Sequence, residues 1–190
     1  CLVGGGVDPL ARLFGDTNQA QTEAVVNISG NCTDVIVLNN GQPVYMRVVP
    51  SGADDVTDAI ANALSISFED AERIKIQIGL QNVTGDERLE KAEEVIRETT
   101  AQLIVGIRNT LNLYDIDHAD GTIGGVILTG TGARLIGLPP VLASSINKVV
   151  RIGDPFIRFR LSKEVEQQNI MAHAIDLGPL LGLVIGKKPR

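Results

Sequence analysis

The chain has 190 residues and a formal net charge of −6, because 23 acidic residues outnumber 17 Lys and Arg. Apolar residues make up 44% of it, which is enough to bury a hydrophobic core and excludes a disordered tail. Aromatic residues make up 3% and Trp is absent, so the composition argues against nucleic-acid binding through a basic surface or stacked aromatic rings.

The first third of the chain favours β structure. We expect a short helix at residues 7–14, and residues 15–22 have the polar composition of a linker. Three runs rich in β-branched residues follow at 24–28, 34–38 and 44–49, separated by residues that favour turns. This spacing predicts a three-stranded antiparallel meander.

The middle of the chain favours helices. Apolar positions recur with a helical period after Asp54, which predicts a helix there. Ser67, followed three residues later by Asp70, has the spacing of a capping box and predicts the start of a second helix. After a loop, the i, i+3, i+4 pattern predicts a long helix from Glu87 to about Leu113.

Three acidic residues, Asp115, Asp117 and Asp120, follow this predicted helix. Their spacing differs from that of an EF-hand calcium loop, which also needs a Glu at its twelfth position, where this chain has Val126. We therefore expect a solvated loop before a buried strand, and we assign no metal site.

The last third of the chain alternates strand and helix again. A strand at 125–129, a glycine-rich turn at 130–137, a helix at 139–147 and a strand at 149–152 form a predicted βαβ unit. Such a unit requires parallel strands joined by a right-handed crossover.

Two more helices are expected near the end of the chain, one capped by Ser162 and one that starts at Gly178. The apolar run at 177–185 is far shorter than the ~20 residues of a membrane-spanning helix, so we interpret it as buried. Cys1 and Cys32 are too few for a disulfide framework, which favours the cytoplasm. Because the chain begins at Cys1 and not at Met, we expect it to be part of a longer protein.

Two segments carry candidate binding residues. The segment VVNISGNCTD at 25–34 has a small polar turn that either directs backbone N–H groups at a phosphate or closes an ordinary β-hairpin. The segment ILTGTGARL at 127–135 has glycines directly after a buried strand, where a phosphate or a flat ring can approach the backbone. The candidates are Asn27, Ser29, Gly30, Asn31 and Thr33 in the first segment, and Gly130, Thr131, Gly132 and Arg134 in the second.

Together these segments resemble the C-terminal lobe of the actin-like ATPase superfamily, and within it the PilM-like type IV pilus assembly proteins, with FtsA-like cell-division proteins as relatives. The first segment resembles the second phosphate loop of that superfamily, and the second resembles its adenosine loop. The stretch AERIK at 71–75 resembles a family helix. The resemblance implies that Glu72 and Lys75 approach the ribose and base of a nucleotide, although their spacing also fits a solvated ion pair on a helix surface.

The resemblance implies a mixed α/β (α+β) fold, an actin-like and ribonuclease H-like lobe. It would combine the three-stranded antiparallel meander, parallel βαβ strands with helices and a small inserted helical subdomain. We expect residues 1–23 to be a segment or linker from the missing lobe, 24–66 and 124–190 to form the core subdomain, and 67–123 to form the mainly helical insertion.

The sequence departs from the family pattern where chemistry is expected. Asn27 stands where catalytic relatives carry an Asp that holds the water shell of a metal. An amide neither neutralises Mg²⁺ nor acts as a base. Ser29 and Asn31 replace two glycines of the phosphate loop, and Thr131 replaces one of the adenosine loop. We therefore expect a degenerate nucleotide site and assign no catalytic residue.

The resemblance implies a cytoplasmic scaffold of type IV pilus assembly, held peripherally at the inner membrane by its partners. Those partners would be the missing N-terminal actin-like lobe and the tail of a PilN-like inner-membrane protein, and a homo-oligomer is compatible with them. ATP or ADP, with Mg²⁺, would bind the intact protein. Two alternatives stay open: an active ATPase or phosphotransferase lobe, and an FtsA-like membrane-tethered cell-division filament protein.

Overall fold

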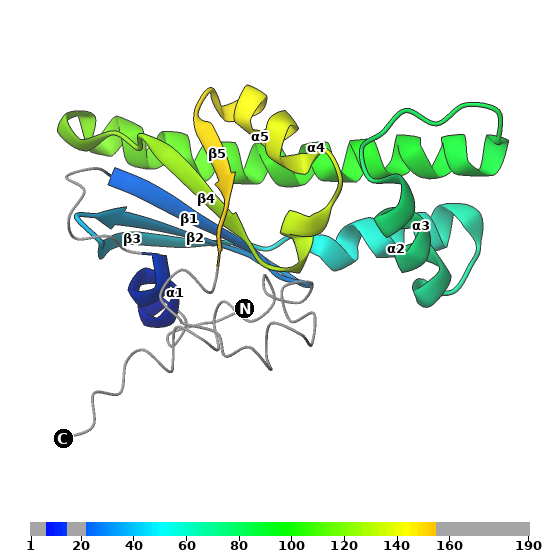
Figure 1. Cartoon of the computed structure of the whole chain (residues 1–190), viewed down its shortest axis with the longest axis horizontal. Coiled ribbons are helices and arrows are strands. Elements are labelled where there is room, and N and C mark those ends of the chain that lie inside the picture. Colours follow the sequence, from blue (N-terminus) through cyan, green and yellow to red (C-terminus); the bar gives the residue numbers. More distant parts are fainter. Residues whose placement is uncertain (1–6, 15–21, 155–190) are drawn as a thin grey trace, which may run out of the picture.

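The computed structural model describes residues 7–14 and 22–154 (Figure 1). The helices predicted at Ser162 and Gly178, and the apolar run at 177–185, lie outside the described residues. Most of the predicted linker at 15–22 lies outside them too.

A five-stranded mixed sheet forms the centre of the fold, in the order β3-β2-β1-β4-β5. β1 pairs antiparallel with β2, and β2 pairs antiparallel with β3. β4 pairs parallel with both β1 and β5. The predicted meander and the predicted parallel βαβ unit are therefore confirmed. The strands are β1 (Thr22–Ile28), β2 (Thr33–Asn39), β3 (Gln42–Val49), β4 (Gly125–Thr129) and β5 (Val149–Ile152).

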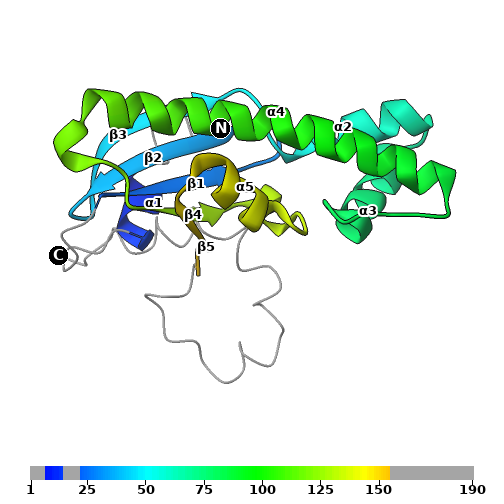
Figure 2. The ribbon, with the colours of Figure 1, turned by 90° about the horizontal axis from the view of Figure 1, so that it is seen from above.

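Helices cover both faces of this sheet and extend past one end of it. α4 and α5 pack on one face, and α1 packs on the other (Figures 1 and 2). α2 and α3 lie beyond the end of the sheet, against the first half of α4. In the described part of the chain, the α-helices are α1 (Val7–Phe14), α2 (Ala53–Leu64), α3 (Phe68–Ile78), α4 (Glu87–Asp117) and α5 (Leu138–Ile146).

The caps of α3 and α4 come from short polar side chains. The Ser67 hydroxyl accepts a hydrogen bond from Asp70 N at 3.1 Å, so the predicted start of α3 is confirmed. The Ser67 hydroxyl in turn donates a hydrogen bond to the Asp70 carboxylate at 2.8 Å. Asp86 caps α4 by accepting bonds from Arg88 N and Leu89 N.

α4 is longer than its sequence pattern predicts. The helix continues one turn past Leu113, because buried Tyr114 packs in the core and its ring stacks on His118 with centroids 4.2 Å apart. Burial, with the Asp115 charge as a smaller cause, raises the pKa of the Tyr114 hydroxyl.

The expected solvated loop at Asp115 and Asp117 is therefore wrong, because both residues belong to the last turn of α4. The Asp115 carboxylate accepts a hydrogen bond from Ile123 N at 2.8 Å. It also pairs with Lys148 at 2.7 Å, and so fastens the end of α4 to the segments before β4 and β5.

α4 approaches the sheet closely at Gly106. A Cβ atom added there would lie 2.8 Å from Cγ1 of Val49, at the end of β3. Val is stiff at its Cβ and cannot easily turn away. The absence of a side chain at Gly106 therefore sets the distance between α4 and β3.

Gly106→Ala is expected to lower the free energy of unfolding in the otherwise unchanged chain. An overpacking cost of about 1–3 kcal/mol opposes a helix-propensity gain of about 1 kcal/mol. In a Val49→Ala background the contact is absent, so the same change should raise stability. Urea unfolding of the four proteins of this cycle measures both values, and a gain in both backgrounds would contradict the close contact.

Candidate functional site

A pocket of about 210 Å³ lies where α2, α3, α4 and the short 3₁₀ helix η2 (Thr131–Arg134) meet. Most of its walls are apolar. Glu72 and Lys75 of α3 line it together with Thr131, Gly132 and Arg134. The structure thus brings the two residues that were predicted to contact the ribose and the base close to the predicted adenosine loop.

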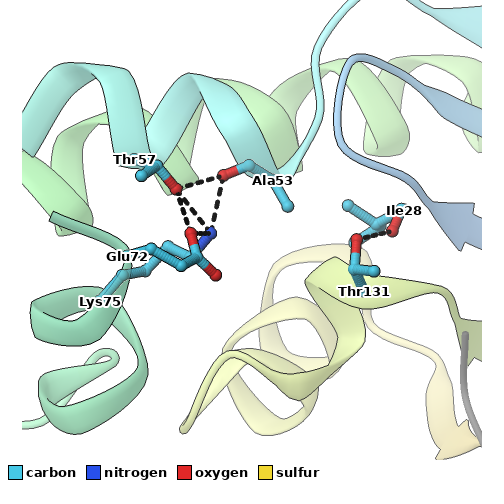
Figure 3. A network of polar contacts seen from close by, with 6 residues as sticks. All are labelled: Ile28, Ala53, Thr57, Glu72, Lys75 and Thr131. Carbon is cyan, nitrogen blue, oxygen red and sulfur yellow. Dashed lines mark hydrogen bonds and ion pairs between the residues drawn. The ribbon is translucent and has the colours of Figure 1, made fainter. Parts of the chain in front are cut away.

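The Lys75 ammonium holds α3 against α2 (Figure 3). Lys75 is 8% exposed, and its Nζ donates to the Ala53 carbonyl at 3.1 Å and to the Thr57 hydroxyl at 2.7 Å. Nζ also pairs with Oε2 of Glu72 at 2.6 Å, so three acceptors match its three protons. Lys75 is therefore not part of a solvated surface pair. Its three bonds stay within the protein and position Glu72.

Glu72 is the member of this pair that remains accessible, with 37% of its side chain exposed. Its Oε2 accepts bonds from Lys75 and from the Thr57 hydroxyl, the latter at 2.6 Å. Oε1 takes no part in the contacts drawn in Figure 3. A carboxylate held in this way can accept hydrogen bonds from ligand hydroxyl groups.

The glycines of the predicted adenosine loop let η2 pack directly on the end of β1. A Cβ atom at Gly130, where φ is +87°, would lie 2.4 Å from the Ile28 carbonyl oxygen. A Cβ atom at Gly132 would lie 2.2 Å from Cγ2 of Ile28. The Thr131 hydroxyl donates to the same Ile28 carbonyl at 3.5 Å. Thr131 therefore fits between the two glycines and still lines the pocket.

The turn between β1 and β2 is joined to the start of α2. Ala53 N donates to the Ser29 carbonyl at 2.9 Å, and Asp54 N donates to the Gly30 carbonyl at 2.8 Å. A Cβ atom at Gly30 would lie 2.4 Å from Oδ2 of Asp54, so a carboxylate stands beside the turn. These contacts use two N–H groups at the α2 N-terminus, which would otherwise attract an anion.

Asn27 lies in the middle of a polar row across three strands. Register places it opposite Asp34 on β2 and Thr129 on β4, and all three are at most 1% exposed. Asn27 Nδ2 donates to Ser29 Oγ at 3.2 Å and to Asp34 Oδ2 at 3.1 Å. Asp34 Oδ1 and Thr129 Oγ1 have no hydrogen-bond partner.

None of the five predicted phosphate-loop residues lines the pocket, whereas their neighbour Ile28 does. Thr33 is buried and donates to the Ser51 carbonyl at 2.9 Å, which fixes the approach to α2. Asn31 is exposed at the tip of the turn. A phosphate-binding role for these residues remains a prediction.

The sequence patterns missed Thr57 and Thr100. Thr57 joins the two charges of α3 but belongs to none of the motifs. Thr100 lines the pocket from α4 and lies on the buried face that carries Ile96 and Leu103. A polar residue on an apolar helix face was the signal that could have identified it.

Across residues 7–14 and 22–154, no group of three or more His, Cys, Asp or Glu side chains is placed to hold a metal ion. Every helix in that same part of the chain is too short or too polar to cross a membrane.

Comparisons with known proteins agree with the family resemblance seen in the sequence. A protein-family model described as type IV pilus assembly protein PilM matches residues 6–187. The cell division protein FtsA of Bacillus subtilis (strain 168) is 26% identical over 150 residues, which are 70% of this chain and 33% of FtsA.

Solved structures show the fold. A PilM-PilN type IV pilus biogenesis complex contains a chain that superposes with a TM-score of 0.81 at 21% identity, covering 96% of this chain and 52% of that one. MreB 5 of Spiroplasma citri bound to AMPPNP superposes with a TM-score of 0.65 at 14% identity, covering 94% and 56%. The predicted actin-like, mixed α/β fold is confirmed. The chain spans about a third of the curated relative and about half of the solved chains.

Gly52→Ala is expected to separate α2 from the β1–β2 turn, because a Cβ atom at Gly52 would lie 2.1 Å from the Gly30 carbonyl oxygen. Two backbone hydrogen bonds would be lost, at a cost of about 2 kcal/mol. Hydrogen exchange should accelerate at the Ala53 and Asp54 amides. Gly124→Ala is the control, since its Cβ would meet only the Thr22 carbonyl at 3.7 Å. Equal exchange rates in both variants would contradict the close docking.

Glu72→Gln is expected to lower the free energy of unfolding by about 1.5–3 kcal/mol relative to wild type. This loss should exceed the loss caused by Lys75→Met. The first change leaves a buried ammonium without its counter-charge, whereas the second leaves a carboxylate that water can still solvate. Arg73→Met is the control, because Arg73 forms an exposed pair with Asp70 at the same spacing. Urea unfolding measures all three, and a larger loss for Lys75→Met would contradict this assignment.

Proposed function

The chain belongs to the family of type IV pilus assembly protein PilM, and we propose that it forms the part of a pilus-assembly scaffold that holds the base and ribose of an adenine nucleotide. One observation carries this proposal: a single pocket unites Glu72 and Lys75 with η2 and its glycine-rich approach. The predicted division into a core and a helical insertion, with 67–123 as the insertion, belongs to the same proposal.

The lining of the pocket suits a flat base joined to a sugar. Val56, Leu103 and Leu138 offer apolar walls, and the accessible carboxylate of Glu72 can accept bonds from ribose hydroxyls. Gly132 of η2 lines the pocket and has no side chain, so a ligand can come close to the backbone there. The AMPPNP named with MreB 5 supports an adenine nucleotide as the ligand.

The phosphate side of the site supports binding with little or no hydrolysis. The Asp54 carboxylate lies beside Gly30 and would repel phosphate oxygens unless a cation such as Mg²⁺ came with them. Asn27 is buried, and its amide group already donates to Ser29 and Asp34. An amide in that place provides no charge for a cation. We therefore propose a degenerate site that responds to the nucleotide without turning it over.

We further propose that the intact protein acts in the cytoplasm, at the inner membrane, through a PilN-like partner. The similarity to a chain of a PilM-PilN complex supports this partner. Since the chain spans about half of that solved chain, the missing N-terminal lobe would complete the nucleotide cleft, and a homo-oligomer is compatible with this arrangement.

Ile76→Glu is expected to weaken binding of ADP and ATP, with Mg²⁺, by about tenfold or more, a change of about 1.4 kcal/mol. Ile76 lines the pocket yet is 63% exposed, so the substitution adds a repelling charge without opening a core. Isothermal titration calorimetry on the protein that contains this chain measures the effect, and phosphate release is followed in the same samples.

Ile116→Glu is the matched control, because Ile116 is 76% exposed in the last turn of α4 and does not line the pocket. The Ile116→Glu variant should bind ADP and ATP with the affinity of wild type. A wild-type protein that binds no nucleotide would contradict the proposed ligand. Phosphate release near the ordinary enzyme rate of ~10 s⁻¹ would contradict the scaffold.

A further inference from the structure

Thr100 of α4 carries a buried hydroxyl without a partner. The residue is 1% exposed, and its Oγ1 makes no hydrogen bond. Another threonine of the same helix uses its hydroxyl internally, because Thr110 donates to the Gly106 carbonyl at 3.0 Å. Thr100 makes no such bond to Ile96, four residues earlier, so its hydroxyl is not used to complete the helix.

A buried hydroxyl without a partner costs free energy, because it loses its hydration and gains nothing in return. Thr100 keeps this cost where Val would fill nearly the same volume with no polar atom. A ligand that supplies the missing hydrogen bond would remove the cost, and Thr100 lines the pocket where the proposed ligand binds.

Among the described residues that line the pocket, Thr100 is the neutral polar side chain with an unused hydrogen-bonding group. The Thr131 hydroxyl already donates to the Ile28 carbonyl. The Lys75 ammonium has three acceptors within the protein. Leu103, the next lining residue along α4, is apolar. Oγ1 itself is buried, so the Thr100 side chain must turn to bring its hydroxyl against a ligand ring at this otherwise apolar wall.

We propose that Thr100 hydrogen-bonds the edge of the heteroaromatic base held in this pocket. The inference rests on the proposed function and adds to it the residue that recognises the base. A hydroxyl both donates and accepts, so it matches a base edge that carries a ring nitrogen beside an amino group. In apolar surroundings, a base without such an edge leaves the hydroxyl unpaired and binds more weakly.

Thr100 also lines a second hollow of about 220 Å³ between α4 and α5, to which Val141 and Ser145 contribute. The pocket of about 210 Å³ described above is the better site for a nucleotide, because Glu72 and η2 also line it. Val141→Trp fills the second hollow from its exposed edge, where Val141 is 43% exposed. This change should leave nucleotide affinity unchanged.

The test compares Thr100→Val with Thr100→Ser in the protein that contains this chain. Thr100→Val should raise the melting temperature of the ligand-free protein, because the unpaired hydroxyl is removed, and should weaken ADP binding about tenfold. These effects have opposite signs, so a general structural defect cannot produce both. Thr100→Ser should retain most of the affinity, and pyrophosphate, which has no base, should bind wild type and Thr100→Val equally.

Thr110→Val is the matched control on the same helix. Its hydroxyl is already bonded to Gly106, so stability should fall slightly while ADP affinity stays constant. If wild type binds ADP and Thr100→Val binds it equally well, the role of Thr100 is overturned while the proposed function stands. If wild type binds no ADP, both are overturned. An equal loss of affinity in Val141→Trp and Thr100→Val would place the ligand in the second hollow and also overturn the proposal.

Discussion

The two backbone polar groups of Ala53 connect the sheet to the helical end of the molecule. Its N–H donates to the Ser29 carbonyl at the end of β1, and its carbonyl accepts from the Lys75 ammonium of α3. Because one residue makes both bonds, the β1–β2 turn, α2 and α3 are held in a fixed relation. The pocket lies within this frame, and Ala53 itself lines it.

α4 also connects the sheet to the helical end of the molecule, because its side chains pack in both apolar clusters. Ala92 and Ile96 belong to the apolar cluster with α2 and α3, whereas Ile107 and Leu111 belong to the core against the sheet. Thr100 lies between these two groups. Thus one helix contributes to both hydrophobic clusters and lines the pocket. Figure 2 shows it running along the sheet and on past the sheet's end to α2 and α3.

Local patterns in the sequence were sufficient for most elements. The strands followed from β-branched runs and turn residues, and Ser67 marked the start of α3, because these signals act over a few residues. The last turn of α4 was missed because its support is distant: Asp115 pairs with Lys148, far along the chain. Within the site, Glu72 and Lys75 were found by resemblance, whereas Thr100 has meaning only once α4 is placed beside the pocket.

The length of α4 gives the fold a mechanical property. At about 1.5 Å per residue, its 31 residues form a rod of roughly 45 Å that spans both hydrophobic clusters. Its close contact with β3 at Gly106 lies 19 residues after its first residue and 11 before its last. The rod therefore joins the pocket to the far end of the sheet, where Asp115 fastens it to Lys148.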